Sequence, residues 1–323
     1  MVKKVSLRKI AKESGCALCT VSRALNSGTP VAETTRKKIL ETAHRLGYRP
    51  TSRKLRIALV VNDTFFHTVY DKNLSAILLQ EIHKKGYSAV VLTVKDLDFL
   101  SLSWTDGIIS YCYDPEEERK IAKKYNIPIV CINNSGCLYE NIYAVNSDDE
   151  NAVRSALELF VSKGHTKIAF LEPEPATISG KLRKKYYENL MRKEFHLKPR
   201  FFITPGSQVW QGVQRVVNEG ITALIIPFEL QNNNGFYFCR FSGISIPQEL
   251  SIITWESPGI SEFFQPPLTT LGQDFGQLAE QSLALLEKLC SSSKKQLGNC
   301  QVPYILHLRE SVGKCNDKTT ASE

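Results

Sequence analysis

The chain has 323 residues, 42% of them hydrophobic, which suggests two or three domains with ample material for a core. Its net charge of +8 is uneven: residues 1–56 hold fourteen Lys/Arg against three Asp/Glu, whereas the rest of the chain has a small acidic excess. No apolar run approaches the roughly 18 residues of a membrane span and no signal-peptide core follows the first lysines, so we expect a soluble, cytoplasmic protein without a membrane partner.

The cysteines and the motif content argue against a metal site and against catalysis. Nine cysteines follow no disulfide framework, and the C-x-x-C pair of Cys16 and Cys19 has no second pair or histidine partner nearby. Neither a dinucleotide nor a P-loop glycine motif opens a helix, and H-E-x-x-H and G-x-S-x-G do not occur. The sequence therefore predicts no cofactor and no catalytic residue, and we expect a protein that is not an enzyme.

The basic segment 1–50 has the pattern of three short helices. Ser6 can cap the first helix, which should stop at Gly15, and two more are expected over about 17–26 and 33–46. Within such a segment, basic residues could also form an unstructured, solvated tail. The regular apolar spacing favours a folded domain instead.

The first two of these helices have the spacing of a helix-turn-helix unit. Ala11 is small where two helices would cross, Gly15 suits a left-handed turn four residues later, and Val21 would pack inward. Because a strongly basic module has a polyanion as its natural partner, we predict a domain that binds double-stranded DNA.

Three motifs in this segment carry a family resemblance. The runs TVSRALN at 20–26, TRKKI at 35–39 and GYRP at 47–50 closely resemble the DNA-binding domain of LacI/GalR bacterial transcription regulators. In that family the second helix lies in the major groove, and the side chains at its start read base edges. The resemblance therefore implies a sequence-specific operator-binding regulator that acts as a homodimer.

The resemblance also assigns DNA contacts to individual residues. Leu18 and Cys19 fall on the two principal specificity positions, and Arg23 on a base or phosphate contact. Both specificity residues lack strong hydrogen-bonding groups, so we predict that they read thymine methyl groups and DNA shape. The implied phosphate contacts are Ser6, Thr20, Ser22, Asn26 and Tyr48. In contrast to the family, alanines stand at the caps of the second and third helices, and each lost cap is worth about 1 kcal/mol.

The segment 51–56 is shorter than the hinge that usually follows this domain in the family. There, a hinge helix places a leucine wedge in the minor groove. Here six residues make fewer than two helical turns, and Leu55 is the sole candidate wedge. Alternatively, the segment is a plain basic tether that brings Arg53, Lys54 and Arg56 near phosphates.

From residue 57 to 311, short β-branched runs alternate with amphipathic stretches, which predicts doubly wound parallel α/β sheets. Two helices are expected over 73–85 and 151–163, and residues 312–323 should form a disordered tail. The expected strands are 57–61, 89–93, 107–110, 128–132, 167–171, 223–227 and 250–254.

This region also resembles the LacI/GalR family, in runs such as DGIIS at 106–110, SKGHTKIAFL at 162–171 and PPLTTLGQDF at 266–275. The resemblance implies a two-lobed fold like that of periplasmic sugar-binding proteins, with a small effector, a sugar or sugar derivative, between the lobes. The implied effector-binding residues are Tyr70, Asp148, Arg183, Glu229 and Gln273.

Two functions remain open at this stage. The first is a repressor of carbohydrate-related genes whose operator affinity changes when the effector binds. The second is an effector-independent or architectural DNA-binding regulator, which the shortened hinge and the changed pocket favour: Thr254, Trp255 and Glu256 stand where the family usually has Gly-aromatic-Asp.

Overall fold

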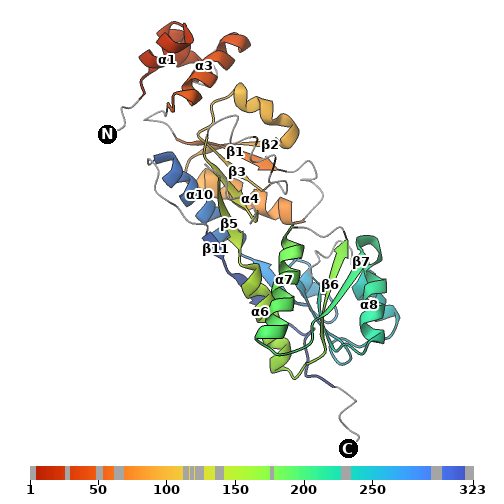
Figure 1. The fold of residues 1–323 in the computed structure, drawn as a ribbon. Coiled ribbons are helices and arrows are strands. Elements are labelled where there is room, and N and C mark those ends of the chain that lie inside the picture. The colour runs from red at the N-terminus through yellow and green to blue at the C-terminus, as the bar shows by residue number, and fades with distance from the viewer. Residues whose placement is uncertain are drawn as a thin grey trace, which may run out of the picture. The chain divides into compact units, whose positions relative to one another are not determined.

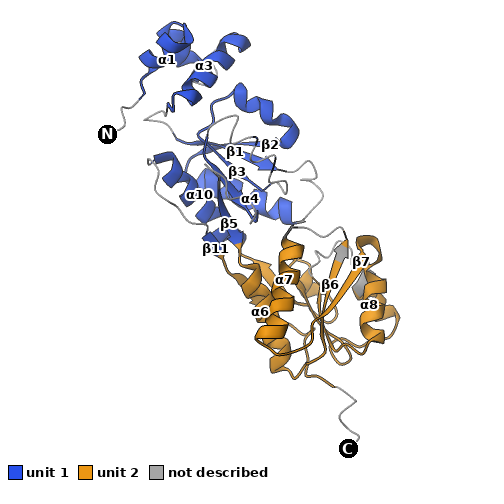
Figure 2. Cartoon of the chain, viewed as in Figure 1, with its two compact units in different colours: residues 1–146, 275–301 blue, residues 147–274, 302–323 orange. Residues whose placement is uncertain are grey.

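The computed structural model describes residues 5–25, 30–48, 54–61, 69–111, 116, 120, 127–134, 142–174, 178–226, 234–291 and 300–316. The chain divides into two compact units (Figure 2). Unit 1 comprises residues 1–146 and 275–301, and unit 2 comprises residues 147–274 and 302–323. The N-terminal helical domain belongs to unit 1.

The N-terminal domain has the three expected helices, α1 (Leu7–Ser14), α2 (Leu18–Leu25) and α3 (Glu33–Arg45). They pack on one another around a small apolar core (Figure 1). Each helix contributes residues three or four apart, the spacing of one helical face. The fully buried members of the core are Ile10, Val21, Ile39, Leu40 and Ala43.

The rest of unit 1 is built on a six-stranded sheet. Its strand order is β11-β5-β4-β3-β1-β2, and the pairs from β2 through β1, β3 and β4 to β5 are parallel. Helices α4 (Val69–Lys84) and α10 (Phe275–Ser291) pack against each other (Figure 1). A 3₁₀ helix, η1 (Val94–Ser101), follows β2. The strands are β1 (Arg56–Val61), β2 (Ser88–Thr93), β3 (Gly107–Ser110), β4 (Ile129–Ile132), β5 (Ile142–Ser147) and β11 (Cys300–Val302).

Unit 2 repeats this plan with the order β12-β10-β9-β8-β6-β7, in which only β12 among the described pairings runs antiparallel. In both units the first strand lies between the second and the third, the order of a doubly wound, flavodoxin-like sheet. The strands are β6 (Ile168–Glu174), β7 (Arg200–Pro205), β8 (Ala223–Ile226), β9 (Ser251–Trp255), β10 (Thr269–Gln273) and β12 (Tyr304–His307).

Both faces of the unit 2 sheet are covered by helices, which explains the continuous apolar runs in its strands. Along β6, Ile168 and Phe170 pack into a cluster with α6 (Asp149–Ser162) and α7 (Ile178–Lys193). The alternate residues Ala169 and Leu171 join the opposite cluster. That cluster includes side chains of α8 (Val209–Asn218) and α9 (Asn234–Phe241). Unit 2 also contains two short 3₁₀ helices, η2 (Gly206–Gln208) and η4 (Ser261–Phe263).

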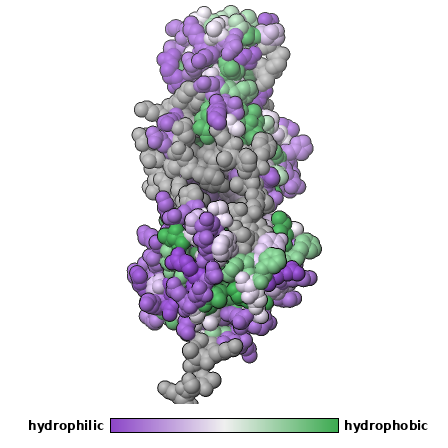
Figure 3. Space-filling view, turned by 90° about the vertical axis from the view of Figure 1, so that its right-hand side faces the viewer, coloured by the Kyte–Doolittle hydropathy of each residue, from purple (hydrophilic) through white to green (hydrophobic). Residues whose placement is uncertain are grey.

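The predicted fold class is confirmed, and all seven predicted strands are present, with ends that differ by at most one residue except in β6, which extends three residues further, to Glu174. The strands that the sequence reading missed are β5, β7, β10, β11 and β12. No described helix combines the length and the hydropathy needed to span a bilayer. Among the described residues on the face shown in Figure 3, hydrophilic side chains predominate and apolar ones gather in smaller areas.

The prediction of a disordered tail from residue 312 is wrong for residues 312–316. Gly313 N donates to Ser251 Oγ at 3.1 Å, and Cys315 N donates to Lys163 O at 2.9 Å. Val312 packs against the core of unit 2. The partners of these backbone groups lie far away in the sequence, so the polar composition of residues 312–316 does not reveal that this segment is ordered.

Candidate nucleic-acid interface

The turn between α1 and α2 has the geometry that its sequence requires. Ser6 caps α1, because its Oγ accepts a hydrogen bond from Lys9 N at 3.3 Å. Gly15 ends the helix with φ 66°, in the left-handed region that glycine adopts without strain. Cys16 N then donates to Ala11 O at 3.2 Å. The chain thus leaves α1 in a tight turn and enters α2 at Leu18.

Helix α2 has one buried and one exposed face. Val21, Ala24 and Leu25 are buried in the domain core, as the apolar spacing predicts. Leu18 is 44% exposed, and Cys19 next to it is also exposed. The start of α2 therefore presents an apolar side chain and a thiol to the outside.

Three more of the predicted contact residues lie on α2. Arg23 is exposed, and Thr20 and Ser22 are half-buried. The end of the helix is fixed from α3, since Arg36 Nη1 donates to Ala24 O at 2.9 Å. This bond satisfies one of the carbonyls that a helix C-terminus leaves without a partner. The hydroxyl, guanidinium and apolar groups are thereby carried on one rigid element.

Helix α3 lacks a side-chain N-cap, as its sequence predicts. Ala32 occupies the N-cap and makes no side-chain hydrogen bond to the helix start. Glu33 in the first turn supplies a negative charge near the helix N-terminus, which offsets part of that loss.

A tryptophan from outside the N-terminal domain joins the core of that domain. Trp104 follows η1 in the sequence, is 4% exposed, and packs in the same cluster as Ile10 and Val21. The His44 ring stacks on it with centroids 4.6 Å apart and an interplanar angle of 8°. The Tyr48 ring meets it edge-on at 5.8 Å. The sequence reading missed this contact.

Asp106 fixes the indole from the other side. Trp104 Nε1 donates to Asp106 Oδ1 at 2.6 Å, and Arg56 N donates to Asp106 Oδ2 at 2.8 Å. Asp106 N in turn donates to Arg56 O at 2.8 Å. Burial lowers the pKa of His44 to about 4, although the nearby charge of Asp106 opposes the shift. His44 is therefore neutral at pH 7 and can stack on the indole without a buried charge.

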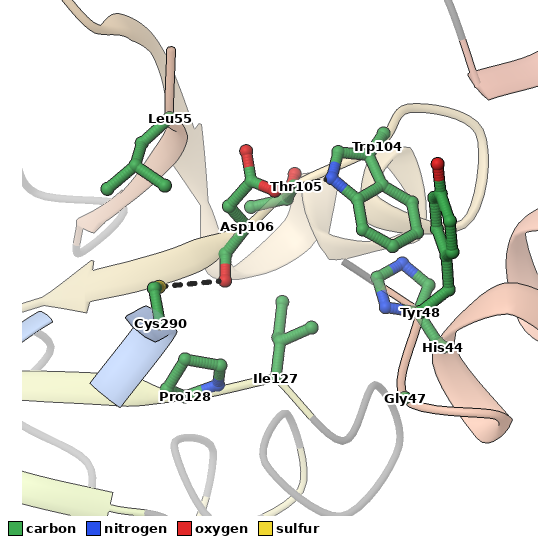
Figure 4. A pocket seen from close by; sticks show the side chains of 10 residues that line it. All are labelled: His44, Gly47, Tyr48, Leu55, Trp104, Thr105, Asp106, Ile127, Pro128 and Cys290. Carbon is green, nitrogen blue, oxygen red and sulfur yellow. Dashed lines mark hydrogen bonds between the residues drawn. The ribbon is translucent and has the colours of Figure 1, made fainter. Parts of the chain in front are cut away.

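A cavity of about 80 Å³ lies beside these rings (Figure 4). Its wall includes His44, Tyr48 and Trp104, together with Leu55 and Cys290. Leu55, the candidate wedge, is half-buried and not helical, and its carbonyl oxygen accepts a hydrogen bond from Ser88 N at 3.0 Å. In this structure residues 54 and 55 thus lead directly into β1.

The predicted effector residue Arg183 is held in a buried polar cluster of unit 2. Its Nε donates to Asp149 Oδ1 at 2.8 Å, and its Nη2 donates to Tyr304 OH at 3.0 Å. Tyr304 OH also donates to Asp149 Oδ1 at 2.8 Å. The guanidinium carbon lies 4.4 Å from the centroid of the Trp255 ring, within cation–π range. Burial by itself would lower the pKa of Arg183, but the charge of Asp149, the neighbouring Tyr304 and the hydrogen bonds to both together raise that pKa above its usual value, so the side chain stays cationic.

The other described effector candidates also have partners. Asp148 caps α6, with Oδ1 accepting from Asn151 N at 3.0 Å. Gln273 Oε1 accepts from Ser147 Oγ at 2.9 Å. In unit 1, Tyr70 OH accepts from Asn133 Nδ2 at 2.7 Å, a partner the sequence reading did not identify. The predicted residues Asn26, Arg53 and Glu229 lie outside the described residues.

Both the N-terminal helical domain and the α/β part of the chain are similar to known protein families. Residues 6–51 match the family model "Bacterial regulatory proteins, lacI family", and residues 157–312 match "Periplasmic binding protein-like domain". Catabolite control protein A of Streptococcus mutans is 28% identical over 315 residues, which cover 90% of this chain and 92% of that protein.

The chain belongs to the LacI/GalR family of bacterial transcription regulators. The resemblance seen in the sequence is therefore confirmed. Members of this family are DNA-binding regulators and not enzymes.

Solved structures show the same fold for this LacI/GalR regulator. The lac repressor dimer bound to operator and an anti-inducer matches with a TM-score of 0.69 and 23% identity, covering 96% of this chain and all of that one. The regulator CelR in complex with cellobiose matches with a TM-score of 0.69 and 18% identity, covering 95% of this chain and all of that one. Among the described residues, no group of His, Cys, Asp and Glu is arranged to hold a metal ion.

Proposed function

We propose that this regulator binds operator DNA as a homodimer, with α2 of each protomer in the major groove, and represses the genes next to the operator. One observation carries the proposal: the buried face of α2 is locked in the core, while its start presents Leu18 and Cys19 outward on a module with a large positive charge. The structure of the lac repressor dimer bound to operator, which has the same fold, is a parallel that supports this proposal. The function places the protein in the bacterial cytoplasm.

The chemistry of the side chains suggests which residues contact bases and which contact phosphates. Leu18 and Cys19 offer contact surfaces that suit thymine methyl groups, while the hydroxyls of Thr20 and Ser22 can donate to phosphate oxygens. Arg23, one turn after Cys19, reaches either a base edge or a phosphate. Tyr48 and Ser6 add phosphate contacts from the flanks of the helices, although Ser6 Oγ already caps α1. Pairing two half-sites supplies the discrimination that one short helix lacks.

Selection of binding sites from random duplexes tests this proposal. We expect a two-fold symmetric site whose half-sites contain A·T pairs opposite Leu18 and Cys19. Leu18→Asn should shift the preference at that position towards adenine, because an amide can pair with adenine N6 and N7. Leu79→Asn, at an exposed leucine of unit 1 outside the domain, serves as the matched control. Binding that ignores sequence and ionic strength would refute the proposal.

For the effector, we propose a sugar or sugar derivative bound by unit 2. The support is chemical: Asp149 and Asp148 offer carboxylate acceptors, Arg183 a fixed donor, and Trp255 an aromatic ring that suits the C–H face of a sugar. The CelR complex with cellobiose is a parallel within the fold. Titration calorimetry with a panel of sugars and sugar phosphates, followed by operator binding with each hit, tests this part.

An effector-independent regulator is the second candidate, and a specific observation favours it. Asp149 and Tyr304 already engage Nε and Nη2 of Arg183, and Asp148 is used as a helix cap. A ligand would have to compete with these bonds. Operator affinity that no sugar changes, together with an absence of heat in calorimetry, would decide for this alternative.

A further inference from the structure

Trp104 connects two parts of unit 1 that are separate in the sequence. By position it belongs to the α/β part, between η1 and β3, yet it is buried in the apolar core of the N-terminal domain. Figure 4 shows the indole beside the rings of His44 and Tyr48. Its exposed fraction of 4% means that residues of the N-terminal domain and of the α/β part together cover nearly all of the side chain.

The contacts hold the indole from both sides. On the side of the N-terminal domain, His44 stacks on its face and Tyr48 meets it edge-on. On the other side, Asp106 accepts from Nε1, and the same carboxylate accepts from the backbone of Arg56 at the start of β1. Because Asp106 ties the ring to β1, an N-terminal domain that packs on this ring has a defined orientation.

The short connection between the two parts strengthens this reasoning. Tyr48 touches Trp104, and Leu55 is already hydrogen-bonded to the backbone of β2. The intervening chain is too short for a hinge helix of two turns. The orientation that a hinge helix would otherwise set must then come from packing.

We propose that Trp104 is a positioning residue for DNA binding: it fixes the N-terminal domain on the α/β part of unit 1 and thereby sets the separation of the two recognition helices in the dimer. This inference rests on the proposed function, since a separation has meaning only for a dimer that binds two half-sites. Tyr48, assigned to a phosphate contact, is held by the same indole.

The inference has a geometric consequence for the operator. One added base pair moves a half-site by about 3.4 Å and turns it by roughly 34–36° about the DNA axis, given about 10 base pairs per turn. A domain fixed by Trp104 cannot follow this movement, whereas a domain on a loose tether can. The contacts of Trp104 with His44, Tyr48 and Asp106, which we call the joint, therefore make operator affinity depend steeply on the length of the spacer between half-sites.

The test measures operator affinity across spacers from two base pairs shorter to two longer than the best one, with constant half-sites. For the unchanged protein we expect at least a tenfold loss per base pair of change. Trp104→Ala should flatten this profile to threefold or less while the preferred bases stay the same. Trp104→Phe keeps the ring packing and should restore most of the steepness, and Trp210→Ala, at a half-exposed tryptophan of unit 2, should leave the profile unchanged.

Since Trp104→Ala could unfold the N-terminal domain, a second measurement does not depend on DNA. With Trp210 and Trp255 replaced by Phe, Trp104 is the single tryptophan of the chain. Its fluorescence should resist quenching by acrylamide, and His44→Ala should raise the quenching rate severalfold.

The outcomes are distinguishable. If the unchanged protein binds no specific duplex, the proposed function fails, and the quenching data alone still report on the joint. If it binds specifically but Trp104→Ala keeps the original spacer profile, or if Trp104 is quenched like a free indole, the positioning role is refuted.

Discussion

Glu172 is a buried carboxyl group whose titration should set the pH dependence of unit 2 stability. It lies near the end of β6, is 5% exposed, and its Oε2 has no hydrogen-bond partner among the described residues. Burial raises its pKa from 4.5 to about 7, although Arg183 and Lys184 oppose the shift. We expect Glu172→Gln, which resembles the protonated form, to remove this titration.

The sign and size follow from linkage. Because the folded-state pKa is raised, the folded protein binds more protons than the unfolded chain between about pH 4.5 and pH 7. The stabilising contribution is therefore fully present below pH 4.5 and is lost as the pH rises through 7. At 1.36 kcal/mol per pKa unit, the shift corresponds to about 3 kcal/mol. At pH 8, Glu172→Gln should then be more stable than the unchanged protein by up to about 3 kcal/mol.

Urea unfolding at pH 4.5, 6, 7 and 8 measures this difference. Other titrating groups affect both proteins alike, so the difference between the two unfolding free energies isolates Glu172. Glu174→Gln, at an exposed residue of the same strand, is the control and should show no such trend. A difference that stays constant from pH 4.5 to pH 8, or that favours the unchanged protein more at high pH, would refute the reasoning.

Three further predictions concern the interface and the core. Arg23→Ala should lower operator affinity. If the slope of log affinity against log salt concentration falls by about one unit per protomer, Arg23 contacts a phosphate, and if the preference at one base pair relaxes, it contacts a base. Unchanged affinity contradicts both. Arg183→Ala leaves the Asp149 side chain, which is 13% exposed, without its cation and should destabilise unit 2 by up to about 3 kcal/mol in urea unfolding, so an unshifted midpoint would count against a stabilising ion pair. Gly212→Ala places a Cβ 2.6 Å from Leu171 Cδ1 and should lower the free energy of unfolding by about 1–3 kcal/mol, although alanine favours the helix; a more stable variant would show that the core yields there.

The elements that the sequence predicts well are those with a strong local signal. In β1 five of the six residues are apolar and buried, which is typical of a strand covered on both faces. β7 lies at an edge of its sheet, and its residues alternate between buried and exposed positions. β10 is rich in threonine and glycine although it is buried. Such strands cannot be recognised from apolar runs.

The buried and exposed positions of α2 can be predicted from the sequence for a similar reason. Helix α2 is short, its inward face follows from apolar spacing, and the outward positions are then fixed by helix geometry. The contact of Trp104 with His44 joins residues sixty positions apart, and no local periodicity carries that information. Likewise, the ion pair of Asp149 with Arg183 joins residues 34 positions apart, and no local pattern in the sequence indicates it.

The chain passes between the two units three times, after residues 146, 274 and 301. Helix α10 returns to unit 1 with Leu278, Leu283 and Leu286 fully buried, and β12 returns to unit 2 beside β10. A premature stop codon shortly after residue 274 would thus strip both units of core elements at once. Recombinant preparation of unit 2 by itself would require an engineered link from residue 274 to residue 302, because no contiguous fragment of the gene encodes it.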